Sequence, residues 1–295
     1  MNLFISAVGF GIASGAVIAL GSLGFTLQFG LSNVLNIAYG AFLTLAVFIG
    51  LLLINANVNP WLAMILAALV TGILSVAYYQ ALIRGLLRRG ASLGGLVIAT
   101  FGVGIALEYI IVSIFGPQVQ SYGLQSGGTV QIGYITLSGL QVTLIILAAA
   151  IMLGLHFLLT RTTLGRAMRA TSVNRTLARS CGIPAERVTQ ITWFLSGVLA
   201  GVAAVSLAMV TASFDFTLGS TFLITVIAAA VVGGIGQPYG AMLGGLIIGL
   251  TTEISAAYLS PAYRDVIAFA LLVAMLLLRP TGLLGIQSRR HNVAG

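Results

Sequence analysis

The chain has 295 residues, of which 59% are hydrophobic and only 6% are charged. Because about 25% of the residues of an ordinary soluble domain are charged, this composition excludes a soluble globular protein and predicts an integral membrane protein. All thirteen cations are arginine, against five acids, and they lie mainly in short segments between apolar runs. There arginine orients helices in a bilayer and forms no continuous phosphate-binding face, so we expect no nucleic-acid partner.

The N-terminal stretch lacks the charged region of a cleavable signal peptide, and we interpret it as a first membrane span that is retained. A span needs about 20 apolar residues. Apolar segments lie at residues 3–27, 31–54, 60–83, 94–115, 139–159, 190–211, 219–235, 240–259 and 264–279, of which 219–235 and 264–279 are short. Only helices satisfy the backbone of an open chain in lipid. We therefore predict an all-α integral membrane protein, a polytopic helical bundle of eight or nine spans with broken or re-entrant helices, the region 219–259 being either two spans or a hairpin.

A polar break, SNVLNIAYG, interrupts the apolar sequence at residues 32–40. Polar groups at this depth are tolerated only where they face protein or a wet cavity. Asn33, Asn36 and Tyr39 are therefore candidates for the lining of a path through the bundle. Hydrogen bonding between helices is the alternative explanation for all three.

Few acids lie within the apolar segments. Glu108 is near the middle of its segment, where an ionised side chain costs about 2.5–3.5 kcal/mol, so it is either a functional residue or bonded to a neighbouring helix. Glu253 is the second such candidate. Asp215 and Asp265 fall near outer helix ends and are expected at an interface with water or with a partner. We interpret Arg264, beside Asp265, as part of a local charge pair.

Arginine clusters at three places along the chain: Arg84, Arg88 and Arg89; the six arginines from Arg161 to Arg187; and Arg279, Arg289 and Arg290. The positive-inside rule places all three clusters in the cytoplasm. Three spans before the first cluster then put the N-terminus outside, and the last cluster puts the C-terminus inside. The loop 116–138 has no charge and is expected outside.

The central cluster lies in RTTLGRAMRATSVNRTLARSCGIPAERV, residues 161–188. A topology signal needs only a few cations close to helix ends, whereas this loop is long and rich in helix formers. The spacing of its arginines indicates a short amphipathic helix over residues 166–182 that lies under the membrane and is broken by Gly182-Ile183-Pro184. A simple topology anchor is the alternative.

Neither catalysis nor nucleotide binding has the residues it needs. Without lysine there is no phosphate-binding Gly-Lys-Ser/Thr loop, and the two histidines support neither a metal site nor a catalytic triad. The single cysteine, Cys181, allows no internal disulfide. The glycine-rich stretch VVGGIGQPYGAMLGG, residues 231–245, joins two apolar segments, so we expect a tight hairpin there. Gly240, Gly244 or Gly245, and Gly249 have the small-xxx-small spacing of closely packed helices.

Three blocks carry a resemblance to a known family: GSLGFTLQFGLSNVLNIAYGAFLTLA, TTLGRAMRATSVNRTLARSCGIPAERVTQITWFLSGVLAGVAA, and the run from AVVGGIGQPYG to LLRPTGLLG. Together they resemble the branched-chain amino acid permease family of ABC importers over nearly the whole length. Family members often carry His at the position of Tyr39 and an acid at that of Ala41, which leaves the substrate open.

The resemblance implies one transmembrane permease domain over residues 1–285, a cytoplasmic tail at 286–295, and a coupling loop at 161–188. The coupling residues it implies are Arg166, Arg169, Arg175, Arg179, Gly182 and Ile183. It further implies cytoplasmic ATPase subunits that bind the ATP, a second permease or a second copy of this chain, an extracytoplasmic binding protein, and a bacterial-type inner membrane. This chain itself would hold no cofactor or metal.

Other classes of function stay open. An importer of urea, short amides, aromatic carboxylates or sugars would have a similar sequence, and a stand-alone channel or facilitator would need no ATPase. A membrane enzyme is the third class, but no set of catalytic side chains supports it. An importer is distinguished from a channel by its association with an ATPase, a second permease and a secreted binding protein.

Overall fold

The computed structural model describes residues 2–124, 128–132, 135–211, 213–279 and 281–284. The helices are α1 (Asn2–Ser32), α2 (Tyr39–Asn55), α3 (Pro60–Tyr78), α4 (Arg84–Arg88), α5 (Leu93–Phe115), α6 (Gly139–Arg161), α7 (Thr163–Val173), α8 (Arg175–Ser180), α9 (Ala185–Val210), α10 (Leu218–Gly233), α11 (Pro238–Tyr258) and α12 (Arg264–Leu278). A π-helix (Tyr79–Ile83) joins α3 to α4, and a 3-10 turn (Pro261–Tyr263) precedes α12. The predicted tail 286–295 lies outside the described residues.

The architecture is that of a polytopic helical membrane protein, as the composition predicts. Within the described residues, seven helices are long and apolar enough to cross a membrane. One of them is continuous from α3 through the π-helix to α4. Two further apolar helices, α2 and α10, are shorter. The chain also forms a small antiparallel pair of strands, β1 (Thr129–Ile132) and β2 (Ile135–Ser138), which the sequence did not predict. The number of crossings stays a prediction.

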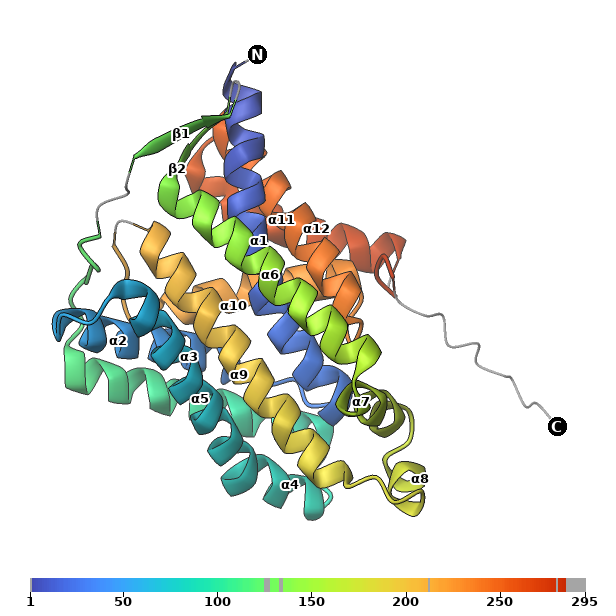
Figure 1. The fold of residues 1–295 in the computed structure, drawn as a ribbon. Coiled ribbons are helices and arrows are strands. Elements are labelled where there is room, and N and C mark those ends of the chain that lie inside the picture. Colours follow the sequence, from blue (N-terminus) through green and yellow to red (C-terminus); the bar gives the residue numbers. More distant parts are fainter. Residues whose placement is uncertain (1, 125–127, 133–134, 212, 280, 285–295) are drawn as a thin grey trace.

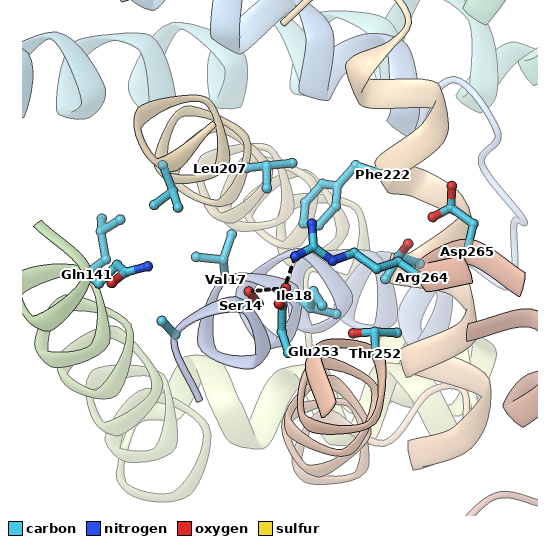
Figure 2. Close-up of a pocket in the computed structure, with 14 residues that line it drawn as sticks. Ser14, Val17, Ile18, Gln141, Leu207, Phe222, Thr252, Glu253, Arg264 and Asp265 are labelled. Atoms are coloured by element: carbon cyan, nitrogen blue, oxygen red, sulfur yellow. Dashed lines mark hydrogen bonds and ion pairs between the residues drawn. The ribbon is translucent and has the colours of Figure 1, made fainter. Parts of the chain in front are cut away.

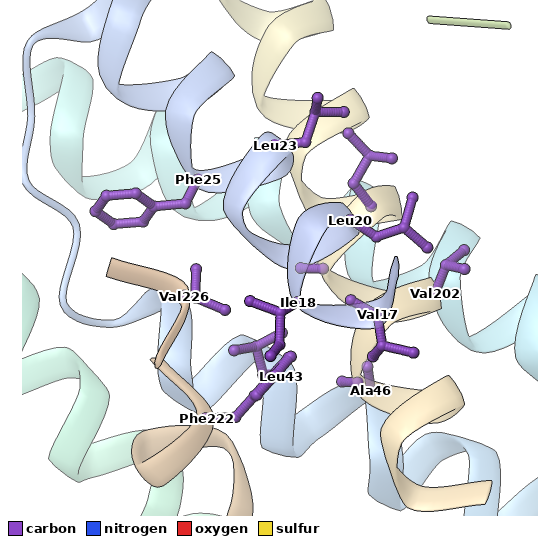
Figure 3. Close-up of a cluster of buried hydrophobic side chains, with 14 of the residues drawn as sticks. Val17, Ile18, Leu20, Leu23, Phe25, Leu43, Ala46, Val202, Phe222 and Val226 are labelled. Carbon is purple, nitrogen blue, oxygen red and sulfur yellow. The ribbon is translucent and has the colours of Figure 1, made fainter. Parts of the chain in front are cut away.

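The core surrounds α1 and α9. Both helices are mostly buried, whereas α5, α6 and α12 bury few of their residues, as lipid-facing helices do. Figure 3 shows part of the buried cluster, in which α1, α2, α9 and α10 contribute aliphatic side chains such as Leu20, Leu43, Val202 and Val226. The outer helices are therefore held against this apolar core largely by close packing.

Small residues permit that packing between α1 and α11. A Cβ atom added to Gly249 would collide with the backbone of Gly15, and one added to Gly245 would collide with Ala19. Gly240 and Gly244 approach Gly233 and Ala229 of α10 equally closely. The small-xxx-small spacing in 240–249 thus marks two close helix contacts, as expected.

The boundaries at the polar break differ from the sequence prediction. We predicted segments at 3–27 and 31–54, but α1 continues to Ser32 and α2 begins only at Tyr39. Asn33 ends α1 with φ 54°, a left-handed conformation that asparagine tolerates better than most residues. Residues 33–38 therefore form a non-helical link.

The predicted single helix over 166–182 is also wrong. Two helices, α7 and α8, occupy this loop, and Asn174 separates them with an extended backbone at φ −152°. Its side-chain oxygen accepts a hydrogen bond from the Leu177 amide at 2.9 Å, which caps α8. Gly182, at φ 80°, then turns the chain toward α9.

The arginine-rich segments gather at one end of the bundle. Figure 1 shows α4, α7 and α8 together at the lower end, and the start of α1 with β1 and β2 at the upper end. The hairpin between α10 and α11 reaches the lower end too, because Gly236 and Arg169 line the same cavity. Gly234 and Gly236 turn this hairpin with positive φ angles, so the tight connection expected at 231–245 is confirmed.

Candidate functional site

A cavity of about 160 Å³ lies in the half of the bundle away from the arginine-rich end. Figure 2 shows its position among α1, α6, α9, α10, α11 and the start of α12. Its apolar wall includes Val17, Ile18, Leu144, Leu207 and Phe222, and its polar groups are Ser14, Gln141, Thr225, Thr252, Glu253, Arg264 and Asp265. We call it the central cavity.

One ion pair organises the polar side of the central cavity. Arg264 Nη2 lies 2.8 Å from Glu253 Oε2, and Ser14 donates its hydroxyl to Glu253 Oε1 at 3.0 Å (Figure 2). The side chain of Glu253 is 14% exposed and that of Arg264 is 49% exposed. Both oxygens of a mostly buried carboxylate therefore have partners, and the guanidinium has one side open.

This pair corrects the expectation for Arg264, which we had paired with Asp265. Neighbouring residues of a helix point in different directions and rarely face each other. At the start of α12, Arg264 instead reaches across to α11 and contacts Glu253, eleven residues earlier in the chain. Asp265 lines the central cavity beside the pair.

A second hollow of about 360 Å³ adjoins the central cavity. The two share Leu207, Phe222, Thr225 and Asp265. Asp215 lines the second hollow, where it accepts hydrogen bonds from the Thr217 amide at 2.9 Å and the Thr217 hydroxyl at 2.7 Å. Asp215 and Asp265 thus lie along one route into the central cavity, near the helix ends where the sequence placed them.

The polar break lies elsewhere. Asn36 is buried and accepts a hydrogen bond from the Tyr78 hydroxyl at 3.5 Å, and Tyr39 is buried and donates to the Gly21 carbonyl at 2.9 Å. Asn33 is exposed at the end of α1. None of the three lines the central cavity, so the structure does not bring them together with Glu253.

Glu108 is likewise separate. It lies on the mostly exposed helix α5, is half-buried, and lines neither the central cavity nor the adjoining hollow. Of the five residues proposed for a path, only Glu253 faces a cavity at this end. The sequence analysis missed Ser14 as a cavity residue. A polar hydroxyl on the strongly apolar helix α1 was the signal that could have identified it.

At the opposite end, the loop 161–188 folds back on the bundle. Arg175 and Arg179 lie 3.1 Å and 3.7 Å from Glu186 Oε2, and Arg84 Nε lies 2.9 Å from Glu186 Oε1. Sequence reasoning missed Glu186, although it is the only acid of the loop. This one carboxylate ties α8 to the end of the α3–α4 span.

The other residues proposed for coupling have different surroundings. Arg169 donates to the Leu159 carbonyl, which holds α7 against the end of α6. Arg166 is exposed. Gly182 forms the turn before α9, and Ile183 packs against the buried core. The loop therefore has a defined position relative to three spans.

In the described part of the chain, no group of three or more His, Cys, Asp or Glu side chains is arranged to hold a metal ion. The polar groups of the central cavity can bind charged or hydrogen-bonding parts of a small molecule, and its wall can bury an apolar part. The arrangement is suited to binding.

Comparison with known proteins decides the family. Residues 7–276 match the family model for the permease component of branched-chain amino acid transport systems. The chain belongs to this family. A probable branched-chain amino acid transport permease protein, LivH, from Methanocaldococcus jannaschii is 31% identical, covering 95% of this chain and 93% of the relative. The high-affinity permease protein BraD of Pseudomonas aeruginosa is 30% identical, covering 93% and 94%.

Among solved structures, PsaBC from Streptococcus pneumoniae in complex with Fab contains a chain that is similar over 95% of this permease and 91% of its own length, with a TM-score of 0.47 and 17% sequence identity. The family assignment rests on the sequence matches, which run from α1 into α12.

Proposed function

We propose that this permease is the membrane-spanning subunit of an ATP-driven importer, and that it carries branched-chain or related small amino acids across a bacterial-type inner membrane. The N-terminus and the 116–138 loop face outside, and the arginine-rich end with the C-terminus faces the cytoplasm. The gathering of the arginine-rich segments at one end of the bundle supports this orientation.

The observation that carries the proposal is the composition of the central cavity. A free branched-chain amino acid has a carboxylate, an ammonium group and an aliphatic side chain. The open side of the Arg264 guanidinium suits the carboxylate, Glu253 and Asp265 suit the ammonium group, and Val17, Ile18 and Leu207 offer an apolar surface. A small number of polar groups in a mainly apolar pocket is the usual pattern of a small-molecule site.

The partners follow from what this chain lacks. It has no lysine and hence no phosphate-binding loop, so ATP hydrolysis belongs to cytoplasmic ATPase subunits that dock on the 161–188 loop. An extracytoplasmic binding protein delivers the substrate to the outer hollow at Asp215. A second permease, or a second copy of this chain, completes the path.

Reconstitution of the complex tests the proposal. The permease, its ATPase and its binding protein are incorporated in liposomes, and uptake of radiolabelled leucine, urea and benzoate is measured with ATP on the cytoplasmic side. We expect leucine to accumulate only with ATP and with all components present. Uptake of urea or benzoate in preference to leucine would assign another substrate. Leucine equilibration by the permease alone would identify a facilitator.

A further inference from the structure

We propose that a cavity at the arginine-rich end of the bundle binds a phosphate group, supplied by an anionic phospholipid headgroup or by free phosphate. The cavity has a volume of about 320 Å³ and lies between α4, α8 and the start of α9. We call it the arginine cavity; its polar lining consists of Tyr79, Arg84, Arg88, Arg175, Arg179 and Glu186. It is separate from the central cavity, with which it shares no residue.

The charges of the arginine cavity do not balance. Four guanidinium groups line the cavity with one carboxylate, that of Glu186, which Arg84, Arg175 and Arg179 share, so the lining residues carry three more positive charges than negative ones. Like charges this close repel one another, and the repulsion is strongest where water is partly excluded. An anion inside the cavity relieves it.

The donors suit a phosphate in particular. Guanidinium groups present planar pairs of N–H donors that match phosphate oxygens. The side chains of Arg84 and Arg175 are recessed, at 33% and 31% exposed. The Nε atom of Arg175 is buried and donates to no atom in the described part of the chain. A small anion with several acceptor oxygens can reach these donors.

Aromatic packing holds the floor of the arginine cavity in place. The π-helix Tyr79–Ile83 begins there, and Tyr79 packs its ring against buried Trp193 with centroids 5.0 Å apart. The Tyr79 hydroxyl lies 3.3 Å from Glu186 Oε1 and 3.4 Å from Arg175 Nη2. The aromatic stack therefore fixes the positions of groups from α8 and α9 before an anion arrives.

The position of the arginine cavity favours a lipid as the source. Exposed apolar side chains run from Ile73 and Ala77 of α3 to Ala81 of the π-helix, just before Arg84. An acyl chain can lie along this stripe while its headgroup reaches the arginines. Basic pockets between membrane helices on the cytoplasmic side are typical binding sites for anionic headgroups. A bound phosphate would then link α4 to α8, which, given the proposed function, is part of the ATPase docking loop.

Binding is tested on the full-length permease in detergent. Native mass spectrometry measures retention of phosphatidylglycerol, with phosphatidylcholine as the neutral lipid, and radiolabelled inorganic phosphate is tested without lipid. Arg88→Gln removes one lining arginine but leaves the Glu186 ion pairs intact. The matched control is Arg89→Gln, because Arg89 is the exposed neighbour with the same charge and does not line the cavity.

We expect one phosphatidylglycerol per chain, bound about fivefold more weakly after Arg88→Gln, which is about 1 kcal/mol, and less than about twofold more weakly after Arg89→Gln. Binding of inorganic phosphate with the same dependence on Arg88, but no lipid retention, assigns the site to free phosphate. Equal losses in the two variants would mean general surface attraction and overturn the proposal, as would failure of both ligands to bind. Release of a co-purifying ATPase by Arg88→Gln, with no change in the binding of either ligand, would also overturn it, because an acidic protein side chain would then occupy the cavity.

Discussion

Arg264 and Glu253 form an ion pair of 2.8 Å that joins α12 to α11 across the 3-10 turn Pro261–Tyr263. The two partners are unequal. The carboxylate is mostly buried and also accepts a hydrogen bond from Ser14, whereas about half of the guanidinium side chain is exposed. Arg264 is thus the partner that can turn to an incoming carboxylate, because Glu253 keeps the hydrogen bond from Ser14.

Replacing Arg264 with glutamine tests this arrangement. The change removes the cation while keeping a polar side chain of similar reach, so a substrate carboxylate loses a charge-assisted hydrogen bond, about 1.5–3 kcal/mol. We expect the KM for leucine uptake to rise at least about tenfold. Arg279→Gln is the control, since the same change is made at an exposed arginine just after α12 that does not line the cavity. Equal effects of both changes would show that the pair has no special role.

Packing between α1 and α11 should be intolerant of larger side chains. Gly249→Val places branched carbons where the backbone of Gly15 lies. Overpacking of this kind costs about 1–3 kcal/mol, so we expect a lower thermal unfolding temperature and less folded protein in the membrane. Gly154→Val on α6 is the control, because nothing lies within 4 Å of its added Cβ. A permease that tolerates both changes equally would contradict the close contact.

Much of the fold could be predicted from apolar length alone, because lipid imposes helices on any apolar segment of sufficient length. The breaks were harder to place. Asn33 and Asn174 end or separate helices through backbone conformations that depend on a few local hydrogen bonds. Such local choices contribute little free energy individually, and the composition of the surrounding segment does not reveal them.

The candidate site was only partly predictable for a different reason. Glu253 was found because a carboxylate in an apolar segment is costly and needs an explanation. Its partner was misassigned because contacts between α11 and α12 depend on a turn whose geometry the sequence does not specify. Glu186 was overlooked because one acid among six arginines changes the net charge of the loop only slightly. In the structure it joins α4, α8 and α9.

The polar break carries its own prediction. Asn36→Leu replaces a buried amide with a side chain that cannot hydrogen-bond. If Asn36 lines a path, uptake should be abolished while the complex still assembles, as judged by co-purification. Tyr78→Phe distinguishes a structural role, because it removes only the bond between the two side chains. Loss of uptake in both variants would assign Asn36 to helix packing.

The orientation can be tested with the single native cysteine. Cys181 is exposed in the turn after α8, so a membrane-impermeant maleimide should label it only in permeabilised cells. In a Cys181→Ser background, Ser121→Cys should react in intact cells, because Ser121 is exposed in the 116–138 loop. The reverse labelling pattern would invert the proposed topology.

The last prediction concerns the ATPase. Reversing Arg175 and Arg179 to glutamate should weaken ATPase association while the other arginines preserve the membrane orientation. The structure adds a second reason for that loss, because both new carboxylates would face Glu186. The double reversal therefore disturbs α8 as well as any docking surface. A variant that leaves the ion pairs intact is needed to separate the two effects.

Leu177→Glu is that variant. Leu177 is 60% exposed on α8 and does not line the arginine cavity around Glu186, so its apolar surface is available to a partner. A charge there should reduce co-purification of the ATPase at least about tenfold, since burying an unpaired carboxylate at an interface costs several kcal/mol, with labelling of Cys181 unchanged. Thr176→Glu, also exposed on α8, shows whether added charge alone has the effect. Undiminished ATPase binding by Leu177→Glu would mean that α8 meets water at this face, and docking would have to occur elsewhere on the loop.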